Sequence, residues 1–225
     1  MRDGKNDSTH ELMHQASPPS WYQPPEAPLG NSQQDPSADE RWRHETAGWG
    51  VRAGARIIDN IVGLIAGAIG GSIGGVFVGV LGAMGVLGED WQELLGKQSV
   101  GGFLLSALGA LAYHTIAEGL GGATIGKLVC GLRAIGTDGR PCSIGGAFKR
   151  SLAFYVDGLF FGLVAYSAMS KSVLNQRIGD RWGATAVVRA RAVPATAARG
   201  AAGGIVLGFL VHCALIALST ILKCL

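Results

Sequence analysis

The feature that most constrains this chain is an uncharged apolar run of 27 residues, from Ile61 to Leu87. An apolar run of about 18 residues or more is typical of a transmembrane helix, because about 20 helical residues cross the ~30 Å hydrocarbon core of a bilayer. Three charged residues, Arg52, Arg56 and Asp59, come just before the run. The sequence therefore predicts a transmembrane helix over 54–87 that carries its charges at one end.

The residues of this helix form an organised stripe. Arg52 and Asp59 are seven residues apart and share one helix face, and Arg56 is placed for an i,i+3 pair with Asp59. Glycines extend the stripe at spacings that let another helix approach closely. The glycines predicted to pack helices are Gly63, Gly67, Gly70, Gly71, Gly74, Gly75 and Gly79. Asp59 is then either a functional residue or an ordinary polar residue near the end of the helix.

Composition narrows the class of protein. Gly makes up 36 of the 225 residues, about twice the usual ~7% share. A net charge of +3 gives no argument for nucleic acid as a partner. The four cysteines show no metal spacing, and the near-match to a phosphate loop at 121–127 lacks the required Ser or Thr. We therefore expect no enzymatic activity, no catalytic residues, no metal and no cofactor. The expected partners are the lipid bilayer and a second copy or another membrane protein.

The polar N-terminus and the remaining apolar segments complete the organisation. Residues 1–46, rich in Pro, Ser and Gln, are predicted to be a disordered cytosolic tail, with the Arg41-Trp42-Arg43 stretch and Trp49 as anchors at the membrane surface. A second span is predicted at 100–118. Residues 191–200 read as a linker to an additional C-terminal transmembrane helix over 201–222.

The second span has two notable faces. Gly102, Ser106, Gly109 and Tyr113 share one face, which is a candidate partner for the glycines of the first helix. His114 and Glu118 are four residues apart near the far end of this span. They are secondary candidates for a site, either as a proton-handling pair or as an ordinary hydrated helix end.

The region 146–171 is apolar but is interrupted by Asp157-Gly158. Basic residues both before and after it favour the cytosolic side, so a re-entrant or interfacial helical hairpin fits better than a single span. Its first residues repeat the pattern R-x-x-A-x-x-x-D of the first helix, with Arg150 and Asp157 in the places of Arg52 and Asp59. If the repeat is real, Arg150 and Asp157 would pair in the same way.

Two short segments, 128–135 and 184–190, have strand character. The fold class predicted is thus an all-α integral membrane protein with Gly-rich transmembrane helices, a helical hairpin or span, and a short cytosolic β-strand pair.

Three separated motifs resemble the RDD family of small membrane proteins. They are AGWGVRAGARIID (47–59), GATIGKLVCGLRAIGTDGRP (122–141) and NQRIGDRWGATAVV (175–188), and the resemblance covers a membrane domain of about 47–190. The family is named for one Arg and two Asp, which the resemblance carries to Arg52, Asp59 and either Asp180 or Asp157. Gly179 stands where members commonly have His, so a proton role for that His does not transfer.

Two functions follow as hypotheses. The resemblance implies residence in a membrane, the plasma or inner membrane in a bacterium. The positive-inside rule, applied to the basic residues of 41–56, places the N-terminus in the cytosol. The resemblance also suggests transport of small ligands, with cation/proton exchange in some members. In an oligomeric transporter, Asp59 would bind a proton or cation, Arg52 would tune it, and Asp157 or Asp180 would gate it. In a membrane scaffold, Arg52–Asp59 would be a structural ion pair and the glycines would hold the assembly together. The polar cluster of interest is Arg52, Arg56, Asp59, Arg150, Asp157 and Asp180.

Overall fold

The computed structural model describes residues 41–97, 99–157 and 162–224. The chain divides into two units, residues 1–35 and 36–225, and all the described residues belong to the second unit. The predicted disordered tail, residues 1–46, lies outside the described residues except for its last six positions.

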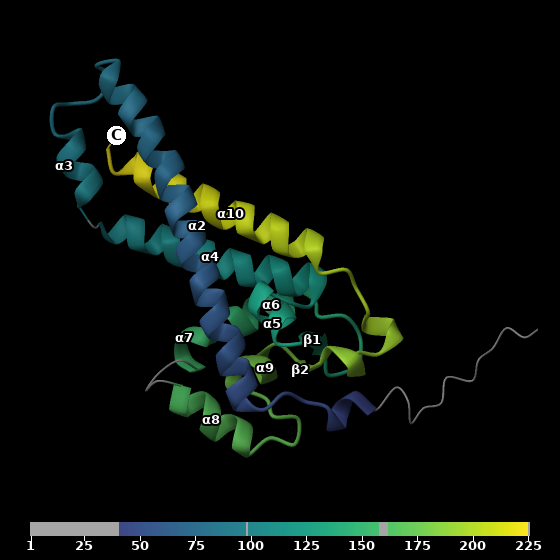
Figure 1. Cartoon of the computed structure of the whole chain (residues 1–225). Coiled ribbons are helices and arrows are strands. Elements are labelled where there is room, and N and C mark those ends of the chain that lie inside the picture. The colour runs from purple at the N-terminus through teal and green to yellow at the C-terminus, as the bar shows by residue number, and fades with distance from the viewer. Residues whose placement is uncertain (1–40, 98, 158–161, 225) are drawn as a thin grey trace, which may run out of the picture. The chain divides into compact units, whose positions relative to one another are not determined.

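Three long helices dominate the second unit (Figure 1). They are α2 (Trp49–Ala83), α4 (Val100–Gly121) and α10 (Ala202–Leu222). Within the described part of the chain, each of the three is long and apolar enough to cross a membrane. Large apolar side chains such as Leu64 and Leu210 remain exposed on them, as expected for helices that face lipid. At ~1.5 Å per residue, α2 is about 52 Å long, so one end extends beyond a ~30 Å hydrocarbon core.

Small residues set the packing of the long helices. Gly74 of α2 lies so close to α10 that a Cβ there would come within 2.7 Å of the Ala217 carbonyl oxygen. On the other side of α10, Gly208 lies against the backbone of Tyr113 in α4, where a Cβ would come within 2.9 Å. The prediction that the small-residue face of the second span, α4, packs on the glycines of α2 is therefore wrong. The small-residue faces of α4 and α2 both pack mainly on α10, because α10 carries small residues of its own.

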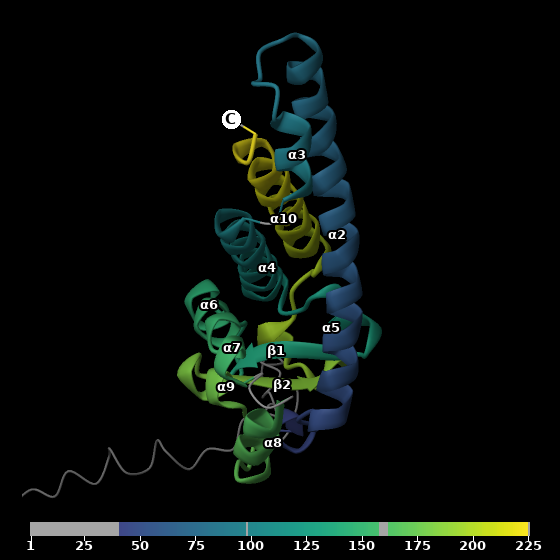
Figure 2. The same ribbon diagram turned by 90° about the vertical axis from the view of Figure 1, so that its left-hand side faces the viewer.

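The remaining elements are short. They are η2 (Arg41–His44), α3 (Trp91–Gly96), α5 (Ile125–Val129), β1 (Leu132–Gly136), α6 (Ile144–Leu152), α7 (Phe154–Asp157), α8 (Leu163–Ser170), α9 (Ile178–Trp182), β2 (Thr185–Arg189), η4 (Ala190–Ala192) and η5 (Ala195–Ala197). Figure 2 shows the strands and the short helices α5 to α9 together, beside the start of α2 and away from α3. The region predicted as a strand from 128 begins instead as α5 and turns at Gly131, whose φ is +64°.

The region 146–171 folds as α6, α7 and α8, none of which reaches the 18 residues that a candidate span needs. This arrangement differs from a single span. The last described residue of α7 is Asp157, and Gly158 lies outside the described residues, so the predicted break at Asp157-Gly158 stays a prediction.

Trp42 is 2% exposed and packs with Ile135, Ala186 and Val188 over the strand pair. The prediction that it anchors the chain at a membrane surface is therefore wrong. Ala197, from the predicted linker, packs in the same cluster. The folded unit thus includes residues on both sides of the predicted membrane domain, because the strand pair needs apolar cover that its own five-residue strands cannot provide.

The helix–strand unit occurs twice. The α5–β1 and α9–β2 segments are 53 residues apart, and the residue before each strand has a positive φ, Gly131 (+64°) and Ala184 (+49°). The strands are antiparallel, with Ala134 opposite Val187 at the centre of the register. Those two residues are also 53 apart, so the register is the one that an internal two-fold axis through the strand pair would produce.

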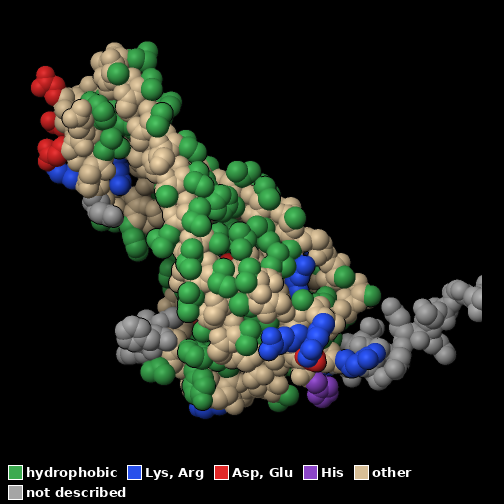
Figure 3. Space-filling model, in the orientation of Figure 1, with side chains coloured by type: hydrophobic (Ala, Val, Ile, Leu, Met, Phe, Trp, Pro, Cys, Tyr) green, Lys and Arg blue, Asp and Glu red, His purple; other side chains and the backbone are tan. Residues whose placement is uncertain are grey.

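Charge is distributed unevenly over this unit. On the face shown in Figure 3, Asp and Glu side chains gather beside α3, and Lys and Arg side chains gather beside the strand pair. The acidic residues Glu89, Asp90 and Glu93 lie in α3 and the turn before it.

Candidate functional site

A cluster of ionisable side chains is buried where the first turns of α2 meet the strand pair. We call it the charged cluster. Its members are Arg52, Arg56 and Asp59 on α2, His114 and Glu118 on α4, Lys127 on α5, Arg150 on α6, Asp157 on α7, and Arg177 and Asp180 at the start of α9. Five are cationic and four are carboxylates. The structure thus brings together the six residues of the predicted polar cluster and both secondary candidates.

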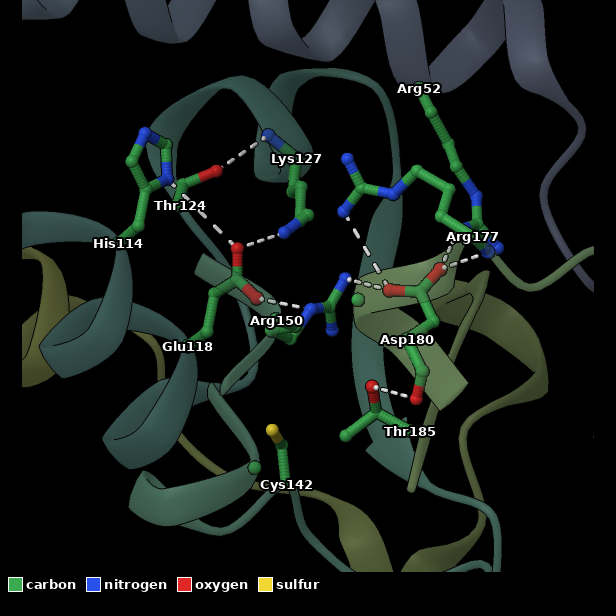
Figure 4. A network of polar contacts seen from close by, with 12 residues as sticks. Arg52, His114, Glu118, Thr124, Lys127, Cys142, Arg150, Arg177, Asp180 and Thr185 are labelled. Atoms are coloured by element: carbon green, nitrogen blue, oxygen red, sulfur yellow. Dashed lines mark hydrogen bonds and ion pairs between the residues drawn. The ribbon is translucent and has the colours of Figure 1, made fainter. Parts of the chain in front are cut away.

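Asp180 is the centre of one half of the charged cluster (Figure 4). Its Oδ2 lies 2.5 Å from NH1 of Arg52, and its Oδ1 lies 3.0 Å from NH2 of Arg150. The backbone N–H of Arg177 also donates to Oδ2, at 3.1 Å. Burial opposes ionisation of Asp180, but the guanidinium groups of Arg150, Arg177 and Arg52 outweigh it and hold the pKa of Asp180 well below its usual range. Asp180, and not Asp157, is therefore the partner of Arg52.

Arg52 connects α2 to the strand layer. Its Nε donates to the carbonyl oxygen of Ala47 at 2.9 Å, and NH2 donates to that of Val187 at 3.4 Å. All three groups of the guanidinium thus have acceptors. The predicted Arg52–Asp59 ion pair is not formed, because Arg52 points to β2 and α9 instead.

Asp59 has a different set of partners. Its carboxylate accepts hydrogen bonds from Thr124 Oγ1 at 2.7 Å, from the Gly126 N–H at 2.8 Å and from the Tyr113 hydroxyl at 3.5 Å. The predicted i,i+3 pair with Arg56 is wrong, because Asp59 faces the first turn of α5, where backbone N–H groups have no acceptor within the helix. This carboxylate therefore fastens α2 to α5.

Glu118 is the centre of the other half of the charged cluster. It forms an ion pair with Lys127 and lies 3.2 Å from Nε of Arg150. Burial lowers the pKa of Lys127 to about 8, against the opposing effect of Glu118. Burial also opposes the charge on Arg150, but Glu118 and Asp180 outweigh it and hold the pKa of Arg150 above its ordinary value. Lys127 and Arg150 are the close partners of Glu118. The Nδ1 of His114 lies 4.0 Å from Oε1 of Glu118, so the predicted proton-handling pair of these two residues is at the distance limit of an ion pair.

Arg56 is bound differently from the other cations. Its NH1 lies 2.7 Å from Nε2 of His114, and its guanidinium carbon lies 3.5 Å from the centre of the Phe154 ring. Because a guanidinium has no acceptor, Nε2 of His114 must accept this hydrogen bond, which places the imidazole proton on Nδ1. Among the described residues no carboxylate lies within 4.0 Å of Arg56, and its buried Nε has no hydrogen-bond partner.

Asp157 lies at the edge of the charged cluster. Its Oδ2 accepts a hydrogen bond from the Gly179 N–H at 3.3 Å and lies 4.0 Å from Nε of Arg177, whereas Oδ1 is buried without a hydrogen-bond partner. Burial raises the pKa of Asp157 above its ordinary value, despite the nearby Arg177.

The R-x-x-A-x-x-x-D repeat has a structural counterpart. Asp59 accepts the N–H of Gly126, and Asp157 accepts the N–H of Gly179. These two glycines are equivalent in the two helix–strand units. In each pattern the alanine contacts the glycine that its own Asp binds. A Cβ on Gly126 would collide with the carbonyl of Ala55, and a Cβ on Gly179 would come within 2.9 Å of the Cβ of Ala153. The predicted pairing of Arg150 with Asp157 is wrong, since each Asp binds a short helix instead of its own Arg.

Two adjoining cavities lie in and beside the charged cluster. The inner cavity has a volume of about 40 Å³, and five cations but only two carboxylates, Asp59 and Glu118, line it. The outer cavity has a volume of about 340 Å³ and is lined mostly by apolar side chains of α2, α7 and α8. Four residues belong to both linings: Arg52, Arg56, Phe154 and Arg177. Among the described residues, no group of three His, Cys, Asp or Glu side chains is placed to hold a metal ion.

The predicted helix-packing glycines fall into two groups. Gly70 and Gly74 face α10, and Gly63 lies 3.9 Å, measured from a Cβ built on it, from Cε1 of His212. The other four, Gly67, Gly71, Gly75 and Gly79, have open space beside them, with no atom of the described residues within 4 Å of a Cβ. Gly70 and Gly74 therefore pack within the chain, whereas the other four glycines form a face without side chains that no described residue covers.

Three helices that are long and apolar enough to cross a membrane, with a buried charged cluster beside them, are typical of a helical membrane protein. The model of the RDD family matches residues 46–184, which is 139 of the 225 residues, and the chain belongs to this family. The resemblance seen in the three motifs is thereby confirmed. No curated protein and no solved structure matches the chain significantly.

Sequence reasoning missed three residues of the charged cluster and its surroundings, namely Thr124, Lys127 and Arg177. All three lie in the motifs that indicated the family, at equivalent places: T-I-G-K at 124–127 and R-I-G-D at 177–180. A comparison of these two motifs with each other is the signal that could have found them.

Proposed function

We propose that this chain is a membrane transport protein for a small ligand, with the charged cluster as its binding site. The observation that supports this proposal most strongly is the pair of adjoining cavities in and beside that cluster. Buried ionisable groups close to membrane helices are costly and indicate function by default. The expectation that the chain is not an enzyme stays a prediction.

The proposed orientation places the strand pair in the cytosol. Basic side chains gather beside the strands and acidic ones beside α3, and the positive-inside rule assigns the basic end to the cytosol. Helix α10 starts near the strand layer, and the Sγ of Cys224, after its end, lies 3.6 Å from the carbonyl oxygen of Trp91 in α3. The N-terminus would therefore be cytosolic and the C-terminus external.

Within the charged cluster, the contacts separate structural residues from ligand-facing ones. Arg52, Asp59 and Asp180 each have several partners that tie elements together. If Asp59 bound a cation, the ion would compete with the hydrogen bonds that Thr124 and Gly126 donate to its two oxygens. Arg56 and Arg177 line both cavities, and Arg56 has no carboxylate partner among the described residues. We therefore assign ligand contact to Arg56 and a fastening role to Asp59.

The test is flux into vesicles reconstituted with the purified full chain. Proton movement is followed under Na⁺ and K⁺ gradients, and uptake of a labelled organic sulfonate is followed in parallel. We expect flux above that of empty vesicles in at least one of these assays. Arg56→Gln should lose it, and Arg140→Gln, at a side chain that is 80% exposed and outside both cavities, should keep it. Flux equal to that of empty vesicles under every gradient, with folded protein, would contradict the proposal.

A second candidate function is that of a membrane scaffold that self-associates through α2. The observation that favours it is the open face of Gly67, Gly71, Gly75 and Gly79, since a small-xxx-small face lets two helices approach closely. Gly71→Leu should then abolish crosslinked dimers in native membranes, whereas Val80→Leu, at a 53% exposed position about 180° around α2 from Gly71, should not. Dimers that survive Gly71→Leu would remove this interface.

A further inference from the structure

We propose that the two cavities form one binding site for an amphiphile with a single anionic head group, held by Arg56, and with its apolar part in the outer cavity. This inference names the ligand class of the proposed function and depends on the charged cluster being a binding site.

The balance of charge supports an anion. Arg52, Arg150 and Arg177 are within 4.0 Å of Asp180, and Lys127 pairs with Glu118. With all of them ionised, the five cations and four carboxylates of the charged cluster have a net charge of +1. Arg56 alone among the five cations lies beyond 4.0 Å from every described carboxylate oxygen. A net positive charge beside a membrane span is costly, and one monoanion on Arg56 would neutralise it.

The carboxylates that face the cavities do not oppose this assignment. Asp59 accepts three hydrogen bonds, and Glu118 pairs with both Lys127 and Arg150. Asp157, which lines the outer cavity, accepts the Gly179 N–H and lies beside Arg177. Protein groups therefore hold the carboxylates of Asp59 and Glu118. Burial raises the pKa of Asp157, and a neutral Asp157 would add to the excess of positive charge. The buried Nε of Arg56 still lacks an acceptor.

The sizes and walls of the cavities describe the ligand. The inner cavity, at about 40 Å³, has room for about three water-sized groups, since one needs roughly 10–15 Å³. A carboxylate, sulfonate or phosphate head is of this order. The outer cavity, at about 340 Å³, lies within the range of small-molecule sites, ~300–1,000 Å³. Its walls include Trp49, Ile57, Ala165 and Met169, which suit a hydrocarbon group. Arg56 lines both cavities, as do Arg52, Phe154 and Arg177, so a head group passing from the outer to the inner cavity passes Arg56.

The same chemistry has two sources: a soluble organic acid, or the head group and part of an acyl chain of an anionic lipid. Both carry one negative charge next to an apolar group.

The experiment is a titration of the purified full chain, in nonionic detergent, with octanesulfonate and with octanol. The sulfonate is permanently charged, and the alcohol has the same chain without the charge. We expect calorimetric binding of the sulfonate and none of the alcohol. Because a hydrogen bond to a charged group contributes about 1.5–3 kcal/mol, Arg56→Gln should weaken sulfonate binding roughly 10- to 100-fold. Ala53→Phe, which fills the outer cavity from its α2 wall, should weaken it at least tenfold, and Arg140→Gln should leave it within twofold.

A competition arm distinguishes the two sources. Displacement of the sulfonate by dihexanoylphosphatidylglycerol, but not by dihexanoylphosphatidylcholine, assigns the site to an anionic lipid, and displacement by neither assigns it to a soluble acid. Equal binding of octanol and octanesulfonate by the unmodified protein would overturn the inference without reliance on any variant. Retained sulfonate binding in folded Arg56→Gln would do the same. Sulfonate binding without vesicle flux would remove the transport proposal and leave this one standing, whereas flux without sulfonate binding would do the reverse.

Discussion

At the scale of single residues, Asp180 and Asp157 have opposite electrostatic surroundings. Asp180 lies among three arginines, and its pKa is held well below the ordinary value. Asp157 has one arginine at 4.0 Å and a pKa raised by burial. Linkage between proton binding and folding therefore gives the two residues opposite effects on stability as pH changes.

For Asp180 we expect a loss of stability on substitution and on acidification. Its folded-state pKa is depressed, so its contribution is fully present above the unfolded-state value near 4 and is lost as pH falls below it. Removing one partner of a buried charge network costs about 3–5 kcal/mol, so Asp180→Asn should lower the unfolding midpoint strongly at pH 7. It should also flatten the acid response between pH 5 and 3 in a detergent-based thermal unfolding assay. A variant as stable as the unmodified protein would contradict the role of Asp180 as the centre of that half of the charged cluster.

For Asp157 the sign is reversed. Its folded-state pKa is raised, so its favourable contribution is present below the unfolded-state value and is lost as pH rises through the folded-state pKa. Asn imitates the neutral form, and Asp157→Asn should therefore keep or raise the unfolding midpoint at pH 7. The same thermal assay checks this, and a large decrease in the midpoint would show that the ionised form of Asp157 stabilises the fold.

At the scale of elements, the fold is organised by two helix–strand units, each docked on an R-x-x-A-x-x-x-D helix. Gly126 and Gly179 occupy the equivalent close contacts. The first helix of the pair, α2, is a long span, whereas α6 and α7 are short. The same kind of contact thus joins α2 to the α5–β1 unit and the short helices α6 and α7 to the α9–β2 unit.

Gly126→Ala tests this docking. A methyl group there would collide with the Ala55 carbonyl, which is backbone and cannot move aside cheaply, so we expect a loss of about 1–3 kcal/mol from overpacking. Gly145→Ala is the matched control, because Gly145 is an exposed helical position with open space beside it. It should be neutral or stabilise the protein by about 0.5–1 kcal/mol. Equal effects of the two substitutions on thermal unfolding would contradict the close contact.

The sequence predicted the elements better than the contacts. The charge-free run could be read from the local pattern, and the family resemblance selected Arg52 and Asp59, with Asp180 or Asp157, as residues of one site. The partners could not be read in this way. Helix periodicity places Arg56 and Asp59 on neighbouring positions, but Asp59 binds Thr124 and Gly126 because α5 presents unsatisfied N–H groups to it. Such long-range contacts depend on tertiary packing, which local spacing does not contain.

At the scale of the whole second unit, the separation of charge gives a topology that can be measured. Val173 is 97% exposed in the loop after α8, and Glu89 lies in the acidic turn before α3. In a Cys130→Ser background, Val173→Cys should react with a membrane-impermeant maleimide only after cells are permeabilised. Glu89→Cys should react in intact cells. Labelling of both positions, or of neither, in intact cells would contradict a cytosolic strand pair.

The central claim is that the charged cluster separates fastening residues from a ligand-binding cation. The most direct test is an experimental structure of the full chain in lipid nanodiscs that resolves the side chains of this cluster. We expect Asp59 on Thr124 and Gly126, Arg52 on Asp180, and Arg56 facing non-protein density in the adjoining cavities. Arg56 paired with Asp59 or another carboxylate, with the cavities filled by side chains, would contradict the claim.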